Sequence, residues 1–227
     1  MQIVYEDNHL IVVSKAVGEI VQGDKTGDQP LVEKLKIYLK EKYHKPGNVF
    51  VGLVHRLDRP VAGLVIFAKT SKALSRMNKL VKEGGVRKAY WALVEAKPTQ
   101  VSGRLVNYLL KNEKQNKSYV VARNHPGAKK ASLYYRLLGS GERYHLLKVL
   151  LETGRHHQIR CQLSHIGCTI KGDLKYGARR SNPDGGISLL AHQLSFEHPV
   201  SHQTIDLVVP PELIDPLFTS ISQNTRG

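Results

Sequence analysis

The sequence predicts a mixed α/β fold of the α+β class, with a large, mainly antiparallel sheet and helices packed outside it. Three observations predict this class. Short β-branched runs separated by turn residues recur along most of the 227 residues. Two segments instead have apolar residues at helical spacing. Between residues 102 and 151 the turns are rich in Asn, Lys and Gly, which favours a meandering antiparallel sheet over helices.

The N-terminal third predicts four strands and two helices, with strands at residues 3–6, 10–14, 49–54 and 64–68 and helices at 30–43 and 72–83. Asp28 is the candidate cap of the first helix, and Pro30 falls in its first turn. Thr70 or Ser71 caps the second helix, which ends at two glycines.

The remainder predicts seven strands and two helices, with strands at residues 87–96, 104–110, 118–122, 131–138, 144–151, 189–199 and 204–209, a helix starting near Arg155 and a terminal helix at 212–220. The helix near Arg155 should run for about three turns. It is expected to direct Ile159, Leu163 and Ile166 inward.

The charge of the chain is strongly positive. Its 34 Lys and Arg residues against 19 Asp and Glu give a formal net charge of +15, spread along the sequence. A folded basic surface attracts a polyanion or an anionic membrane. The sequence has no lipidation motif, no signal-like start and no apolar run near the ~20 residues that span a bilayer. Nucleic acid is therefore the favoured partner, and no membrane association is expected.

Length and cysteine content bound the organisation. A chain of 227 residues that is 41% apolar can bury a substantial core in one large domain or two small ones. No Pro/Gly/Ser-rich linker divides it. Cys161 and Cys168 are the two cysteines, which is not a disulfide framework, so the expected location is a reducing cytoplasm.

The stretch VGLVHRLDRPVAGLVIFAKT, residues 51–70, places a polar segment between two apolar strands. Loops held between core strands commonly carry chemistry. Asp58 is bracketed there by His55, Arg56 and Arg59, and nearby positive charge keeps a carboxylate ionised. An ionised carboxylate can act as a nucleophile. By spacing alone, however, a structural Asp that caps a turn and pairs with an arginine is the more common case.

This run resembles the signature HRLDxxTSG of the RluA-type family of RNA pseudouridine synthases. The match covers His55, Arg56, Leu57, Asp58 and Gly63, whereas Val61 and Ala62 stand where the family usually has Thr and Ser. The family's aspartate in this motif is the catalytic nucleophile. The resemblance therefore implies that role for Asp58.

Two further motifs follow in the family's order. RKAYWALVEA resembles the motif RKxYxAxV, whose tyrosine lies in the active site, and Tyr90 takes that position. TGRHHQIRCQLSHIGCTIKGDLKYG resembles TGRxHQIRxHLxxxGxPIxGDxxYG. In this motif Arg160 falls at the active-site arginine that pairs with the catalytic aspartate. Gln162 replaces the usual His, and the pairs Gly172-Asp173 and Tyr176-Gly177 are expected to be turns.

The resemblance covers about residues 1 to 210 and implies the pseudouridine synthase catalytic fold with a central cleft. We expect one catalytic domain over residues 1–227, without a separate N-terminal RNA-binding domain, acting as a monomer on ribosomal or transfer RNA. Asp58, Tyr90 and Arg160 are the expected catalytic residues. The residues expected to contact RNA are His55, Arg56, Arg59, Arg155 and His157.

Isomerising uridine needs a carboxylate and a proton-transferring group, with no redox change or external energy. No GxGxxG or GxxxxGK[ST] run occurs, so no cofactor is expected. His157, Cys161 and His165 invite a zinc interpretation, but the outer two are about 12 Å apart along a helix, whereas ligands lie ~2 Å from the ion. We therefore expect no metal.

Two other functions are compatible with the sequence. A nucleoside or glycoside hydrolase usually needs two carboxylates, and only one has a reactive setting here. A non-catalytic RNA-binding protein of the same fold would explain the basic charge and the Val61-Ala62 replacement. Product analysis separates the three functions, because hydrolysis releases uracil, isomerisation leaves the RNA intact, and binding changes nothing.

Overall fold

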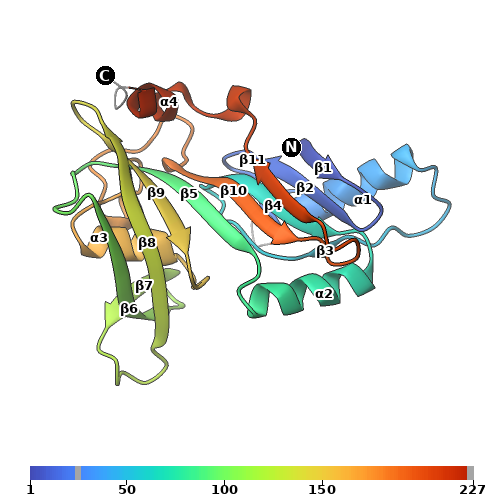
Figure 1. Cartoon of the computed structure of the whole chain (residues 1–227), viewed down its shortest axis with the longest axis horizontal. Helices are drawn as coiled ribbons and strands as arrows, with labels where there is room; N and C mark the ends of the chain where they lie inside the picture. Colours follow the sequence, from blue (N-terminus) through green and yellow to red (C-terminus); the bar gives the residue numbers. More distant parts are fainter. Residues whose placement is uncertain (24–26, 224–227) are drawn as a thin grey trace. The chain divides into compact units, whose positions relative to one another are not determined.

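The computed structural model describes residues 1–23 and 27–223, and the chain divides into two compact units (Figure 1). The first unit holds Met1–Val86 and Gln193–Pro210, and the second holds Arg87–His192 and Pro211–Gly227. Strand β10 (Leu189–Glu197) begins in the second unit and ends in the first.

Six strands belong to the first unit in whole or in part. The strand order is β1-β2-β4-β10, with β3 also paired to β4 and β11 to β10. Besides β10, they are β1 (Gln2–Glu6), β2 (Leu10–Lys15), β3 (Gly52–Leu53), β4 (Ala62–Ala68) and β11 (Thr204–Val208). The β1–β2, β2–β4, β3–β4 and β10–β11 pairs are antiparallel.

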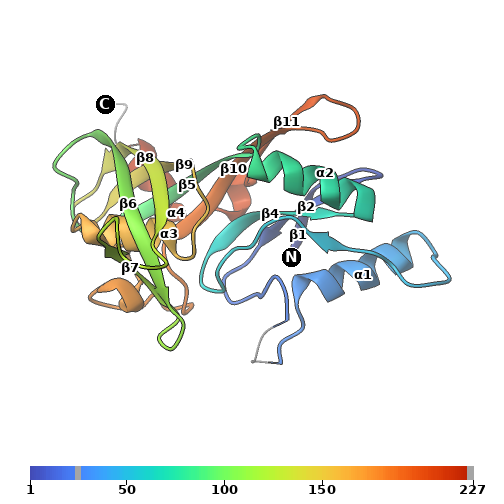
Figure 2. The same ribbon diagram turned by 90° about the horizontal axis from the view of Figure 1, so that it is seen from below.

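The core of this unit lies on both faces of its central strands. Residues 10–13 of β2 and 64–68 of β4 are all 0% exposed. Because successive side chains of a strand point to opposite faces, both faces must be covered. Helices α1 (Leu31–Lys42) and α2 (Ser71–Lys82) lie on either side of these strands (Figure 2). The Thr70 hydroxyl accepts from the Ala73 N–H and caps α2, as predicted.

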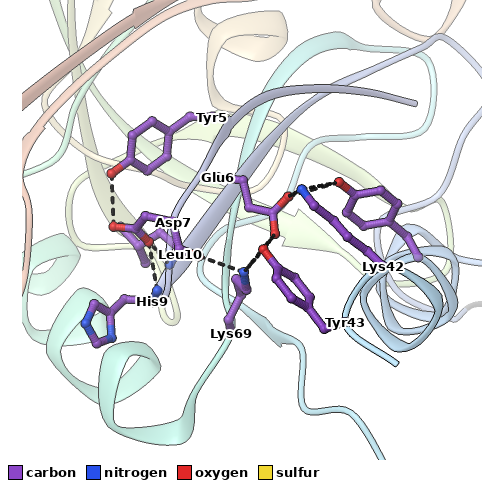
Figure 3. A network of polar contacts seen from close by, with 9 residues as sticks. Tyr5, Glu6, Asp7, His9, Leu10, Lys42, Tyr43 and Lys69 are labelled. Atoms are coloured by element: carbon purple, nitrogen blue, oxygen red, sulfur yellow. Dashed lines mark hydrogen bonds and ion pairs between the residues drawn. The ribbon is translucent and has the colours of Figure 1, made fainter. Parts of the chain in front are cut away.

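Glu6, at the end of β1, links the sheet to α1 and to the residue after β4 (Figure 3). Its carboxylate accepts hydrogen bonds from Tyr38 (3.0 Å), Lys42 (2.8 Å), Tyr43 (2.7 Å) and Lys69 (2.8 Å). The side chain is 7% exposed. Burial would raise the pKa of Glu6, but these donors lower it to about 2. The negative charge of Glu6 is therefore stabilised by the same contacts that join β1 to α1 and to the residue after β4.

The second unit is built on an antiparallel sheet whose strand order does not follow the sequence. The strand order is β10-β5-β9-β8-β6-β7. The strands are β5 (Arg87–Val94), β6 (Ser102–Asn112), β7 (Lys117–Val121), β8 (Lys129–Ser140) and β9 (His145–Leu151). The β5–β9, β9–β8, β8–β6 and β6–β7 pairs are all antiparallel, which confirms the predicted antiparallel sheet. The predicted meandering order is wrong, because β8 pairs with β6 instead of β7 and β5 pairs with β9 instead of β6.

One face of this sheet is covered by α3 (Gln158–His165) and by the short 3-10 helix η1 (Leu174–Tyr176). Leu109 of β6, Ala131 of β8, Cys161 of α3 and Tyr176 form a buried cluster there. The C-terminal helix α4 (Pro216–Gln223) packs on β8 and β9 and brings Phe218 within 6.3 Å of the Trp91 ring.

The predicted fold class is confirmed, but two details near the N-terminus are wrong. Asp28 does not cap α1, because Pro30 is the N-cap and the carbonyls of Ile20 and Val21 accept the first helical N–H groups. The strand predicted at residues 49–54 shrinks to the two residues of β3. Strand β2 occupies one edge of β4, and β3 shares the other edge with β10.

Two helices also differ from prediction. The helix expected near Arg155 begins at Gln158, because His157 has a left-handed backbone with φ 50°. Ile166 follows this helix and is 38% exposed rather than inward. The terminal helix expected at 212–220 is the 3-10 turn η2 (Pro211–Leu213) followed by α4, which starts at Pro216 because proline fits a first helical turn.

Candidate active site

The loop that carries Asp58 joins β3 to β4 and is held at both of its ends. The Val54 N–H donates to the Ile66 carbonyl (3.2 Å), and the Ile66 N–H donates to Nε2 of His55 (3.3 Å). At the other end the Val61 N–H donates to the Asp58 carbonyl (3.0 Å) and closes a turn. The buried core strand β4 therefore positions the half-buried Asp58 side chain on a tight turn.

Lys15, the last residue of β2, lies beneath this turn. Its ammonium donates to the carbonyls of Ala16 (2.9 Å), Arg59 (3.1 Å) and Val61 (2.7 Å), and the residue is 1% exposed. Burial lowers the pKa of Lys15 to about 8, against the opposing effect of nearby carboxylates that include Asp58. All three donors of the ammonium are used, so Lys15 fastens the backbone that follows Asp58.

The other polar side chains of the loop differ in exposure. His55 is half-buried, whereas Arg56 and Arg59 are exposed. The Arg59 guanidinium donates to Asp28 at 2.6 Å. Asp28 is therefore an ion-pair partner of this loop and not the cap of α1. Arg56 therefore lies on the solvent side of the turn, where a contact with RNA is sterically open.

The replacement of Thr-Ser by Val61-Ala62 leaves the turn intact. Val61 is 2% exposed, and both its backbone N–H and its carbonyl are engaged, with Asp58 and Lys15 respectively. The hydrogen bonds that shape this turn come from backbone groups and from Lys15. They need no hydroxyl at Val61.

Arg160, on α3, forms a bidentate ion pair with Asp173. Its Nε lies 2.7 Å from one carboxylate oxygen of Asp173 and its Nη2 lies 2.8 Å from the other. The two residues are 5% and 1% exposed. Such a fork fixes the plane of the guanidinium as well as its charge. Asp173, which was predicted to be a turn residue, thus orients Arg160.

The residues that precede Arg160 are ordered around Tyr176. The Tyr176 hydroxyl accepts from the Ser118 N–H (2.8 Å) and lies 3.1 Å from Nδ1 of His157. Burial, reinforced by the charge of Arg160, lowers the pKa of His157 to about 2, so its imidazole is neutral at physiological pH. His156 stacks on His157 with ring centroids 3.8 Å apart. His157 is therefore a buried structural partner of Tyr176.

Tyr90 and Arg155 have contrasting settings in the same unit. Tyr90, on β5, is 7% exposed and pairs in register with Val149, on the sheet face that α3 covers. Arg155 is exposed, and its Nε donates to the Lys130 carbonyl at 3.0 Å. Tyr90 is thus rigidly placed, whereas the Arg155 side chain is accessible from solvent.

The predicted residues fall into two groups. His55, Arg56, Asp58 and Arg59 share one loop of the first unit, and the other four belong to β5, to α3 and to the segment just before α3 in the second unit. Sequence reasoning did not identify Lys15 or Asp173 as contributors. A lysine at the end of an apolar strand, in LIVVSK, was the available signal for Lys15.

Within residues 1–23 and 27–223, no three His, Cys, Asp or Glu side chains are arranged to hold a metal ion. Within the same ranges, no helix has the length and apolar character needed to cross a membrane.

Residues 9–165 match the family described as RNA pseudouridylate synthase. The chain belongs to the RNA pseudouridylate synthase family. A ribosomal large subunit pseudouridine synthase D of Zymomonas mobilis is 30% identical over 100% of this chain and 74% of its own length. Uncharacterized RNA pseudouridine synthases of Bacillus subtilis and Synechocystis are each 32% identical and cover 99% and 92% of this chain. This pseudouridine synthase family membership confirms the RluA-type resemblance of the sequence.

The fold of this pseudouridine synthase family member is also found in a solved structure. Human RNA Pseudouridylate Synthase Domain Containing 4 has a TM-score of 0.79 and 23% identity, covering 99% of this chain and 93% of the human one. At this identity the similarity shows the fold. Among the relatives compared by sequence, the chain spans 65% of the length of the Synechocystis protein and 74% of the Bacillus protein.

Proposed function

We propose that this chain converts uridine to pseudouridine at defined positions of a structured RNA, using Asp58 as its catalytic carboxylate. The observation that carries the proposal is the placement of Asp58 on a turn fastened by the buried Lys15, in a chain of the RNA pseudouridylate synthase family. A nucleophile must be held rigidly near the bond it attacks. The Lys15 contacts supply that rigidity.

The proposed roles follow the chemistry of the reaction. The glycosidic bond of uridine is broken, the uracil turns, and a carbon–carbon bond to the same ribose forms. Asp58 either attacks the ribose or assists elimination to a glycal, and both routes need an ionised carboxylate. Tyr90 is the proposed proton carrier, since its hydroxyl is the acid–base group that the second family motif provides.

Arg160 is proposed to orient Asp58 and keep it ionised. Its Nε and Nη2 pair with the buried carboxylate of Asp173. A guanidinium fixed in this way can direct a further charge-assisted hydrogen bond with little loss of side-chain entropy. Asp173 is then a positioning residue that acts through Arg160.

Large-subunit ribosomal RNA is the proposed substrate, supported by the names of relatives such as the Zymomonas mobilis enzyme. We propose that Arg56, Arg59 and Arg155, which are exposed and basic, contact this RNA. His55 is proposed to support the backbone at Ile66, and His157 to support Tyr176, beside these contacts. The proposal includes a single catalytic domain acting as a monomer in the cytoplasm. The free, buried Cys161 and Cys168 are compatible with a reducing compartment.

The test is to compare the chain with its Asp58→Asn variant on cellular RNA. Pseudouridines are mapped in cells with the gene, without it, and with each variant restored. Asp58→Asn should remove the same sites as deletion of the gene, because an amide is not a nucleophile. Asp206→Asn, an exposed change on β11, should restore them.

The mapped sites also decide the RNA, since loss in transfer RNA instead of ribosomal RNA would replace the proposed substrate. Free uracil released from purified RNA would indicate a hydrolase. Full modification by Asp58→Asn would contradict the proposed mechanism.

A further inference from the structure

The sheet of the second unit has one face that α3 does not cover. In the β-ladder, Arg104 of β6 lies opposite Tyr134 of β8, and Tyr134 lies opposite Leu150 of β9. Paired residues project from the same face of a sheet, and residues two apart on one strand do so too. Val106 and Tyr108 therefore share this face. We call Val106, Tyr108, Tyr134 and Leu150 the open strip.

The side chains of the open strip are accessible. Val106 is 45% exposed and Leu150 is 40% exposed, and the two tyrosines are half-buried. Helix α4 packs on the same sheet elsewhere, where Phe218 meets Trp91 and Ile221 approaches Gly141. Apolar and aromatic side chains that stay uncovered in this way mark an interaction surface.

Basic side chains border the open strip. Arg136 lies on the same face, opposite Lys148, and Lys130 lies opposite Tyr108. The Arg123 guanidinium lies 6.0 Å from the centre of the Tyr108 ring, within the range of a cation–π contact. Glu152 is an acidic side chain at this border, and it pairs with Arg104 at 2.6 Å. The border is therefore strongly positive.

We propose that the open strip binds a single-stranded segment of the RNA substrate by base stacking. On this sheet face, tyrosine rings can stack with bases while the neighbouring arginines and lysines bind phosphates. A second copy of this chain would bring like charges together, which disfavours self-association through this face. RNA matches both the aromatic and the basic character of the surface.

The open strip lies on the face of this sheet opposite to the one that carries Tyr90. Tyr90 pairs with Val149, which pairs with Tyr135, so Tyr90 projects from the opposite, α3-covered face. RNA held by the open strip would be a flanking segment rather than the target uridine. This inference rests on RNA being the substrate, but it concerns affinity and not the chemical step.

The experiment uses an oligoadenosine of about 20 nucleotides, long enough to span the site of a single-strand-binding sheet. It carries one 6-thioguanosine for photocrosslinking and has no uridine to modify. We expect crosslinks in the peptides that contain Tyr108 or Tyr134. The double variant Tyr108→Val/Tyr134→Val should lower the affinity about tenfold or more, because each lost stack weakens binding. Phe50→Val, an exposed aromatic change in the first unit, should not.

The charge of the border is tested separately by salt titration. Arg136→Gln should reduce the salt dependence of log affinity by about 0.7, the value for one phosphate contact of a single strand. Lys79→Gln on α2 is the matched control for charge. Thermal unfolding of each variant checks that the protein is folded.

The outcomes separate this inference from the proposed function. The RNA-binding role of the open strip would be overturned if the double tyrosine variant bound within twofold of the parent affinity, or if crosslinks were confined to other peptides. A protein partner would then be the remaining occupant of the open strip. The pseudouridine pattern of the Asp58→Asn variant bears on the chemistry alone, so either proposal can fail without the other.

Discussion

Arg160 and Asp173, which are 13 residues apart in the sequence, form a bidentate ion pair in which both side chains are almost fully buried. A pair of this kind contributes little net stability by comparison with apolar packing, but removing one partner is costly because a buried charge loses its counter-charge. The pair therefore sets the orientation of α3 and of the guanidinium proposed to act on Asp58.

Asp173→Asn should lower the free energy of unfolding by about 3 kcal/mol, since it removes the carboxylate from a buried pair. It should also slow isomerisation, because the guanidinium is then less firmly oriented. Urea unfolding and single-turnover rates measure the two effects. Asp206→Asn, an exposed change of the same chemistry, is the control. Equal behaviour of the two variants would show that Asp173 does not position Arg160.

Lys15 should make stability depend on pH in the alkaline range. Burial holds its pKa at about 8 in the folded protein, against about 10.4 for an unperturbed lysine. Between these values the unfolded state binds more protons, so the free energy of unfolding should rise with pH. This gain in unfolding free energy is absent at pH 8 and below, and it amounts to about 3 kcal/mol at most.

The measurement is the difference in unfolding free energy between the parent protein and Lys15→Met at pH 7.5, below that window, and at pH 10, near its upper end. The difference should shift in favour of the parent at the higher pH. Lys15→Met should also reduce the rate of isomerisation, since three carbonyls around the Asp58 turn lose their donor. A pH-independent difference with full activity would rule out this role.

Glu6→Gln should destabilise the first unit far more than Glu33→Gln. Glu6 is 7% exposed and accepts from four donors, whereas the Glu33 side chain is 50% exposed and meets Lys36 on the helix surface. We expect a loss of about 2 kcal/mol or more for Glu6→Gln and less than about 0.5 kcal/mol for Glu33→Gln. Chemical denaturation measures both values.

The Glu6 contribution also has a defined pH dependence. Its pKa is about 2 in the folded protein and about 4.3 when unperturbed, so the stabilisation is complete above pH 4.3 and disappears as pH falls toward 2. Acid unfolding of Glu6→Gln should therefore be less steep than that of the parent protein. Parallel acid-unfolding curves would contradict the assigned role.

Arg56→Ala should affect structured RNA more than unstructured RNA. Arg56 is exposed on the loop that carries Asp58, and a target base must leave its stack before its sugar can react. A planar guanidinium can fill the vacated position. Activity is compared on a structured substrate and on a short unstructured RNA with the same target uridine. An equal loss on both would place Arg56 in the chemistry or in the fold.

Local patterns of the sequence are sufficient to predict the elements whose signals lie within a few residues. The Thr70 cap and the alternating apolar residues of the long antiparallel strands are patterns within a few residues, and the structure confirms them. The three family motifs likewise located Asp58, Tyr90 and Arg160 in contiguous segments. The chemical group that each of these residues offers is fixed by its residue type and is therefore known before the fold is.

The side chains that support these residues come from distant parts of the chain and are known only from the folded structure. Lys15 reaches carbonyls 44 and 46 residues away, and Glu6 collects donors 32 to 63 residues away. The short length of β3 results from neighbouring strands that are distant in sequence. The late start of α3 at Gln158 results from the left-handed backbone of His157. Burial makes these contacts strong, because a polar group removed from water must find its partner inside the protein, and that partner is set by packing rather than by the adjacent sequence.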